Sequence, residues 1–118
     1  MDKKVVDSSK APAQVFPWGE IRWLHSAATG AEGLTIGEVV INPGQENRPH
    51  SHPNCEEVLY LISGELEHTC GDEEPYVLKP GMSIRIPAGA RHNARCTSAE
   101  SARMLVAYSS PNREVVEE

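Results

Sequence analysis

The sequence predicts an all-β fold, a barrel or sandwich built from many short strands. Nine glycines and nine prolines punctuate its 118 residues, and short runs rich in β-branched and aromatic residues lie between them. No stretch keeps a helical apolar period over three turns. Short strands separated by regular turn signals are typical of β-sandwiches and barrels. The chain length fits one domain.

The expected strands follow from the runs between turn signals such as Lys79-Pro80-Gly81. Apolar residues alternate with polar ones in the segment 82–86, which is the pattern of a half-buried strand. The polar, proline-broken residues 1–13 are expected to form an arm, residues 14–110 the barrel and residues 111–118 a tail. The expected strands span residues 20–25, 34–41, 48–52, 58–62, 65–70, 76–78, 83–86, 92–96 and 104–108.

Composition narrows the classes of partner. The formal net charge is −6, from 17 acidic and 11 basic residues, and no basic block is present, so nucleic acid is not an expected partner. No run of 18 apolar residues exists that could span a membrane. The first ten residues have no apolar signal region, and the three cysteines, Cys55, Cys70 and Cys96, are sparse and odd in number. We therefore expect a cytoplasmic protein without an intrachain disulfide.

Histidines in a short motif suggest a metal site. His50 and His52 are two apart on an expected strand, so both project to one face about 6.6 Å apart along it. Two imidazoles can then bind one ion at roughly 2.0–2.1 Å. Glu57 follows a polar turn, and His92 follows the turn that contains Pro87. A carboxylate beside imidazoles suits a transition metal better than Ca²⁺ or Mg²⁺. The His-x-His pair alone is a weak signal, because such pairs also occur on ordinary surfaces.

Two longer motifs resemble those of the cupin family. The first reads Gly44-x5-His50-x-His52-x4-Glu57-x6-Gly64, and the second reads Gly81-x5-Pro87-x-Gly89-x2-His92-x3-Cys96. The 16 residues between them are a spacing typical of compact bacterial cupins. The resemblance implies a double-stranded β-helix, also called a jelly-roll barrel. It further implies one divalent transition metal per chain, either Zn, Mn, Fe, Ni, Co or Cu, bound by His50, His52, Glu57 and His92.

The second motif departs from the family pattern at Cys96, where cupins have Asn. Counting by two from His92 places Ala94 and Cys96 on the same inward face. Cys96 is expected to serve as a small core residue, with metal ligation or oxidation as the alternative. Cys55 lies in the turn between ligands, where exposure is expected.

Two further residues are candidates for catalysis or substrate binding. His68 shares the inward face of its strand with Leu66 and Cys70, so it is a candidate acid–base or hydrogen-bonding group in the pocket. The alternative is a histidine bonded to a nearby carboxylate. Arg48, two residues before His50, is a candidate for pairing with a substrate carboxylate or phosphate, or else it forms a surface ion pair.

Aromatic and apolar residues raise the question of a second subunit. Phe16, Trp18 and Trp23 are close in sequence and form either an aromatic wall for a sugar ring or other flat substrate, or a surface that packs on the barrel or on a second subunit. The segment 58–62 is apolar on both faces, although a barrel needs only one. Because a bare apolar patch is unusual on a monomer, we expect a homodimer, with residues around Trp18 and Trp23 and the outer face near Tyr60 in the contact.

The expected function depends on the site, because one fold supports many chemistries. A metal with four protein ligands keeps open positions for a small-molecule substrate, whose carbonyl it can polarise. The resemblance to sugar-catabolic cupins suggests an isomerase or tautomerase acting on a hydroxy-carbonyl compound such as a sugar or uronate. The alternatives are a metal-dependent dioxygenase of the quercetinase or acireductone type and a non-catalytic cupin that binds a small molecule.

Overall fold

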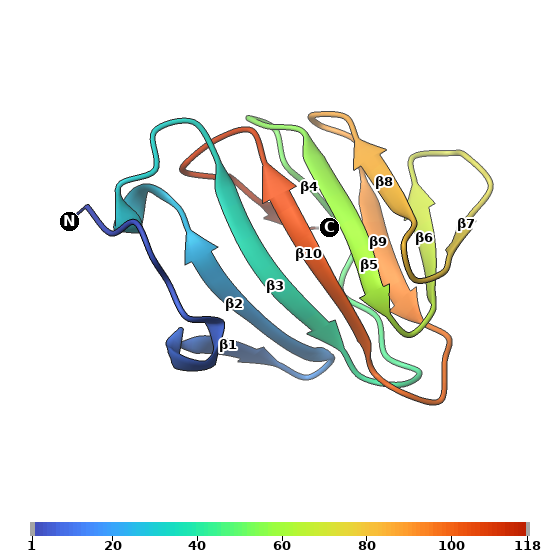
Figure 1. The fold of residues 1–118 in the computed structure, drawn as a ribbon. Helices are drawn as coiled ribbons and strands as arrows, with labels where there is room; N and C mark the ends of the chain where they lie inside the picture. Colours follow the sequence, from blue (N-terminus) through green and yellow to red (C-terminus); the bar gives the residue numbers. More distant parts are fainter. Residues whose placement is uncertain (1, 118) are drawn as a thin grey trace.

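The computed structural model describes residues 2–117, which form two antiparallel sheets that face each other (Figure 1). Two short 3₁₀ helices span Ser8–Lys10 and Ala27–Thr29. The strands are β1 (Ala13–Phe16), β2 (Gly19–His25), β3 (Thr35–Ile41), β4 (His50–Ser51), β5 (Glu57–Ser63), β6 (Leu66–Cys70), β7 (Tyr76–Leu78), β8 (Ser83–Ile86), β9 (His92–Cys96), β10 (Ala102–Tyr108) and β11 (Val116–Glu117).

The order of the strands confirms the predicted all-β jelly-roll fold. The first sheet runs β1-β2-β3-β10-β5-β8 and the second runs β11-β4-β9-β6-β7. Strands far apart in sequence are neighbours, as with β3, β10 and β5, which lie side by side in Figure 1. Consecutive strands also cross between the sheets, since β5 and β6 belong to different sheets. This interleaving places residues from both sheets around one interior.

Alternating burial explains how these segments form a barrel. Residues of β3, β5, β6, β9 and β10 alternate between the interior and the outer face with a period of two. The inward side chains form one apolar core, with Ile41, Leu61, Leu66 and Met104 among its most deeply buried members. Burying large aliphatic side chains stabilises the fold by about 1.5–3 kcal/mol each.

Gly64 is required by the turn between β5 and β6. Its φ is +82°, a left-handed conformation that favours glycine. A Cβ atom there would lie 2.7 Å from the Cα of Ala102 and 2.9 Å from the carbonyl oxygen of Ser101. The glycine that ends the first motif therefore allows the start of β10 to pass close to this turn.

Most expected strands occur, but several boundaries differ. The strand expected at 48–52 contains only His50–Ser51, because Pro49 and Pro53 flank the pair and cannot donate to a sheet. The strand expected at 104–108 begins earlier, at Ala102. The strands β1 and β11 were not expected, because neither has a clear alternating pattern. The proposed domain boundaries at 13/14 and 110/111 stay predictions.

All three cysteines are unpaired and buried. Cys96 is fully buried in the core, as its inward position predicts. The expectation that Cys55 is exposed was wrong, because its side chain turns inward from the β4–β5 loop and joins the apolar core. Across residues 2–117, no helix is long and apolar enough to cross a membrane.

Candidate metal centre

The four residues predicted as metal ligands come together inside the barrel. His50 on β4 and His92 on β9 are direct cross-strand partners in one sheet. Glu57 begins β5 in the facing sheet. His52 lies just beyond β4 and is buried, so it converges with the others even though the strand ends at Ser51. The ligand atoms of the four side chains all lie within 4.8 Å of one another.

Each histidine of the cluster is oriented by its own backbone hydrogen bond. The Nδ1 atoms lie 2.7 Å from the Arg48 carbonyl oxygen for His50, 2.9 Å from that of Glu114 for His52, and 3.0 Å from that of Ala90 for His92. A carbonyl oxygen only accepts, so each Nδ1 is the donor, and in a neutral imidazole the Nε2 atom then keeps the free electron pair. Histidine ligands of metals are commonly oriented in this way.

A divalent metal ion fits this set of donors. The Oε1 atom of Glu57 lies 3.2 Å from Nε2 of His52 and 3.1 Å from Nε2 of His92. The Nε2 atom of His52 is buried and has no hydrogen-bond partner among the described residues. A buried nitrogen without a partner is costly in a core, and coordination to a cation satisfies it. Three imidazoles and one carboxylate suit a transition metal.

Burial and neighbouring charges shift the pKa values of three residues in the cluster. Burial alone would raise the pKa of Glu57, but the adjacent imidazoles of His52 and His92 lower it to about 2. The pKa of His50 falls to about 4, mainly because burial disfavours its charged form. Burial acts in the same direction on His92, yet its hydrogen bond to Glu57 leaves the pKa raised. Near neutral pH the carboxylate is charged and His50 is neutral, which are the protonation states of metal ligands.

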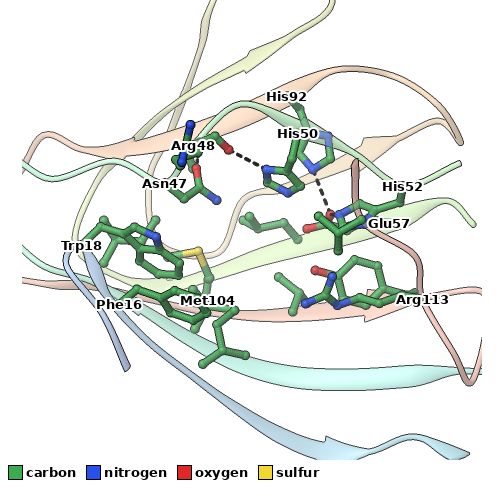
Figure 2. Close-up of a pocket in the computed structure, with 18 of the residues that line it drawn as sticks. Phe16, Trp18, Asn47, Arg48, His50, His52, Glu57, His92, Met104 and Arg113 are labelled. Carbon is green, nitrogen blue, oxygen red and sulfur yellow. Dashed lines mark hydrogen bonds and ion pairs between the residues drawn. The ribbon is translucent and has the colours of Figure 1, made fainter. Parts of the chain in front are cut away.

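The cluster opens into a cavity of about 550 Å³ that runs through the barrel. Phe16 and Trp18 lie at the end of this cavity opposite the cluster, with ring centroids 4.8 Å apart and planes at 5° (Figure 2). Both polar and apolar side chains line the wall between the two ends. The polar ones include Gln14, Asn47, Arg48 and His68, and the apolar ones are Ile21, Val39, Ile41, Leu59, Ala94, Met104 and Val106.

His68 and Arg48 both line this cavity. The side chain of His68 is 1% exposed and stacks on His92, with ring centroids 5.7 Å apart and planes at 12°. Its Nδ1 atom has no hydrogen-bond partner in the described part of the chain, so the expected bond to a neighbouring carboxylate does not form. Burial and the charge of His92 lower the pKa of His68 to about 4. Arg48 lies at the exposed margin of the cavity.

Several pocket residues were not identified from the sequence. Tyr108 packs edge-on against His52, with ring centroids 4.9 Å apart, and burial raises its pKa well above the usual value. Arg113 comes from the segment after β10 and lines the cavity beside Tyr108. The alternation of β10 could have placed Tyr108 inside the barrel. No local pattern marks Arg113, because its segment has no regular structure.

Comparison with known proteins identifies relatives over most of the chain. The chain is 33% identical over 109 residues to the polyketide synthase CurC of Streptomyces cyaneus. This alignment covers 89% of this chain and 70% of CurC. It is 34% identical over 103 residues to the protein SchB of Streptomyces halstedii, and that alignment covers 86% of this chain and 74% of SchB. Among solved structures, the polyketide cyclase RemF of Streptomyces resistomycificus superposes with a TM-score of 0.81, at 23% identity, over 97% of this chain and 84% of RemF.

A family model agrees with these similarities. The model described as "Cupin domain" matches residues 37–108, which include both motifs and all four residues of the cluster. The matched region extends from β3 to β10, the strands that carry the core and surround the cavity. The chain belongs to the cupin family.

Proposed function

We propose that this cupin is a metal-dependent enzyme that moves protons on a flat polycarbonyl substrate, leading to tautomerisation or ring closure. The observation that supports this most directly is the pairing of a three-histidine, one-glutamate cluster with a cavity that has an aromatic end. A divalent ion bound by His50, His52, Glu57 and His92 would supply Lewis acidity toward a carbonyl oxygen. The similarity to the polyketide synthase CurC supports a polyketide-type substrate.

The aromatic end of the cavity favours a flat substrate. The parallel rings of Phe16 and Trp18 offer a surface on which a flat conjugated system can stack. Apolar side chains such as Val39 and Met104 can contact its carbon skeleton, and polar side chains such as Asn47 can donate to its carbonyl oxygens. The isomerase chemistry expected from the sequence is retained in this proposal, but its substrate is a polyketone.

His68 is the proposed proton carrier. It is neutral near pH 7 and lies in the cavity without a partner for Nδ1, so it can accept a hydrogen bond or a proton from a bound substrate. In ring closure, a methylene between two carbonyls loses a proton to His68, its carbon attacks a further carbonyl carbon, and the alkoxide formed takes up the proton. The hydroxyl then leaves as water with the second proton of the methylene, and a C=C bond forms.

Incubation with a synthetic poly-β-carbonyl thioester tests this proposal. Protein loaded separately with Zn²⁺, Mn²⁺, Fe²⁺, Ni²⁺, Co²⁺ or Cu²⁺ is incubated with and without oxygen, and products are analysed by mass spectrometry. We expect a product of unchanged mass, or one that has lost water, at the same rate with and without oxygen. The variant His68→Phe should lower the rate about 100-fold or more while metal content stays the same.

Each other outcome contradicts part of the proposal. A product that gains oxygen atoms, formed only in air, would indicate the alternative dioxygenase. Tight binding without conversion for all the metals would indicate a non-catalytic binding protein. If His68→Phe retains full activity, another group moves the proton.

A further inference from the structure

We infer that Arg113 binds an anionic oxygen of the substrate beside the metal centre, and that Asn54 holds it there. The inference rests on the function proposed above for the class of ligand, to which it adds an anionic group such as a carboxylate or enolate. Arg113 belongs to the segment after β10, outside the residues matched by the family model.

The position of Arg113 is set by two aromatic rings. Its guanidinium carbon lies 4.4 Å from the ring centroid of Trp23 and 5.3 Å from that of Tyr108. The Tyr108 ring in turn contacts the imidazole of His52. Figure 2 shows Arg113 at the end of the pocket that holds His52 and Glu57, away from Phe16 and Trp18. The guanidinium therefore lies at the metal end of the pocket, beside the position that the reacting end of a substrate would occupy.

Among residues 2–117, the guanidinium of Arg113 has no ion-pair or hydrogen-bond partner, and it stacks on the rings of Trp23 and Tyr108. Stacking on rings occupies the flat faces of a guanidinium and leaves its N–H groups at the edge available. Five donors in a fixed fork match a carboxylate or a pair of neighbouring oxygens. A partly buried cation of this kind attracts an anionic ligand.

Asn54 fixes the backbone on both sides of Arg113. Its Nδ2 donates to the carbonyl oxygen of Asn112 at 2.8 Å, and its Oδ1 accepts from the backbone N–H of Glu114 at 2.8 Å. The Glu114 carbonyl oxygen accepts the hydrogen bond from Nδ1 of His52. One side chain thus ties the segment that carries Arg113 to the loop that carries a metal ligand. Asn54 is a positioning residue, because it acts through Arg113.

Binding of a matched pair of flat ligands tests the inference. Isothermal titration measures the dissociation constants of 2-naphthoate and its neutral isostere 2-naphthamide for the Zn²⁺-loaded full chain. Their ratio reports the preference for the anion. We expect Arg113→Gln to reduce this preference about tenfold or more, and Arg113→Lys to retain part of it. Titration of the metal-free full chain removes the attraction of the ion itself, and the effect of Arg113→Gln should persist there.

Two further variants separate the positioning role of Asn54 from a general effect of removing an arginine. Asn54→Leu should reduce the preference for naphthoate while affinity for naphthamide stays close to that of the unmodified protein, because Arg113 is present but misplaced. Arg103→Gln is the matched control, since Arg103 pairs with Glu38 on the outer face of the barrel. It should leave the ratio unchanged.

The inference is overturned if Arg113→Gln keeps the full preference for naphthoate in both metal states. The same holds if Arg113→Gln and Arg103→Gln reduce it equally. These ligands are bound and not converted, so the result is independent of the reaction. A chain with an Arg113-dependent preference but no activity on polycarbonyls would contradict only the proposed function.

Discussion

At the scale of single residues, the centre depends on how each imidazole is aimed. The three Nδ1–H groups donate to the carbonyl oxygens of Arg48, Glu114 and Ala90, and the Nε2 atoms of His52 and His92 face Glu57. Two of these carbonyls lie two residues from their histidine, whereas Glu114 is distant in sequence. The orientation of His52 therefore depends on the segment that also carries Arg113.

His52→Ala tests the metal centre. The change removes one of four donors, so we expect metal affinity to fall by more than about 100-fold, beyond the 10–100-fold effect typical of losing a supporting hydrogen bond. Elemental analysis of the purified protein after dialysis against a weak chelator measures the ion per chain. His25→Ala is the control, because His25 lies outside the cluster and contacts Thr29. Equal metal content in the two variants would rule out His52 as a ligand.

At the scale of elements, β5 shows the different roles of its two faces. Glu57, Leu59 and Leu61 point inward, where the first is a predicted ligand and the others line the core. Val58, Tyr60 and Ile62 point outward. The strand therefore contributes to the metal centre, the core and the outer surface at once.

A pair of alanine substitutions compares these faces. Leu61→Ala removes a fully buried side chain and should lower the free energy of unfolding by about 2–5 kcal/mol, through lost burial and the cavity left behind. Ile62→Ala, one residue later on the outer face, should change it by less than about 1.5 kcal/mol. Urea denaturation followed by tryptophan fluorescence gives both values. Similar losses for the two variants would show that the outer face is also buried in solution.

At the scale of the whole molecule, the first sheet has an apolar patch on its outer face, centred on β5. Val58, Tyr60 and Ile62 remain 42%, 45% and 42% exposed, and Leu105 on β10 is the cross-strand neighbour of Tyr60. The rings of Trp18 and Trp23 pack against the core of their own chain. The homodimer predicted from the sequence therefore depends mainly on this outer face, which an isologous two-fold contact would cover.

Sedimentation at micromolar concentration measures the mass and so tests the dimer. We expect twice the chain mass of 12.9 kDa. Tyr60→Glu places a charge in the contact and should weaken dimerisation about tenfold or more, because a buried aromatic contributes about 1.5–3 kcal/mol. Val77→Glu is the control, at an exposed valine in the other sheet. A mass of one chain for the unmodified protein would refute the prediction.

The sequence by itself determined the fold class and the four residues of the cluster. Period-two alternation and turn residues are local signals, so β6 and β9 were placed with His68, Ala94 and Cys96 facing inward, as the structure confirms. The motif spacing singled out His50, His52, Glu57 and His92, which the structure brings within reach of one ion.

Only the tertiary structure decided what surrounds this cluster. Contacts between segments far apart in sequence determine three features. These are the short strand at His50, the inward orientation of Cys55 and the position of Arg113. Asn54 and Glu114, for example, are 60 residues apart. Such contacts form where packing and unpaired backbone groups bring two segments together, and neither segment has a local pattern that specifies its partner.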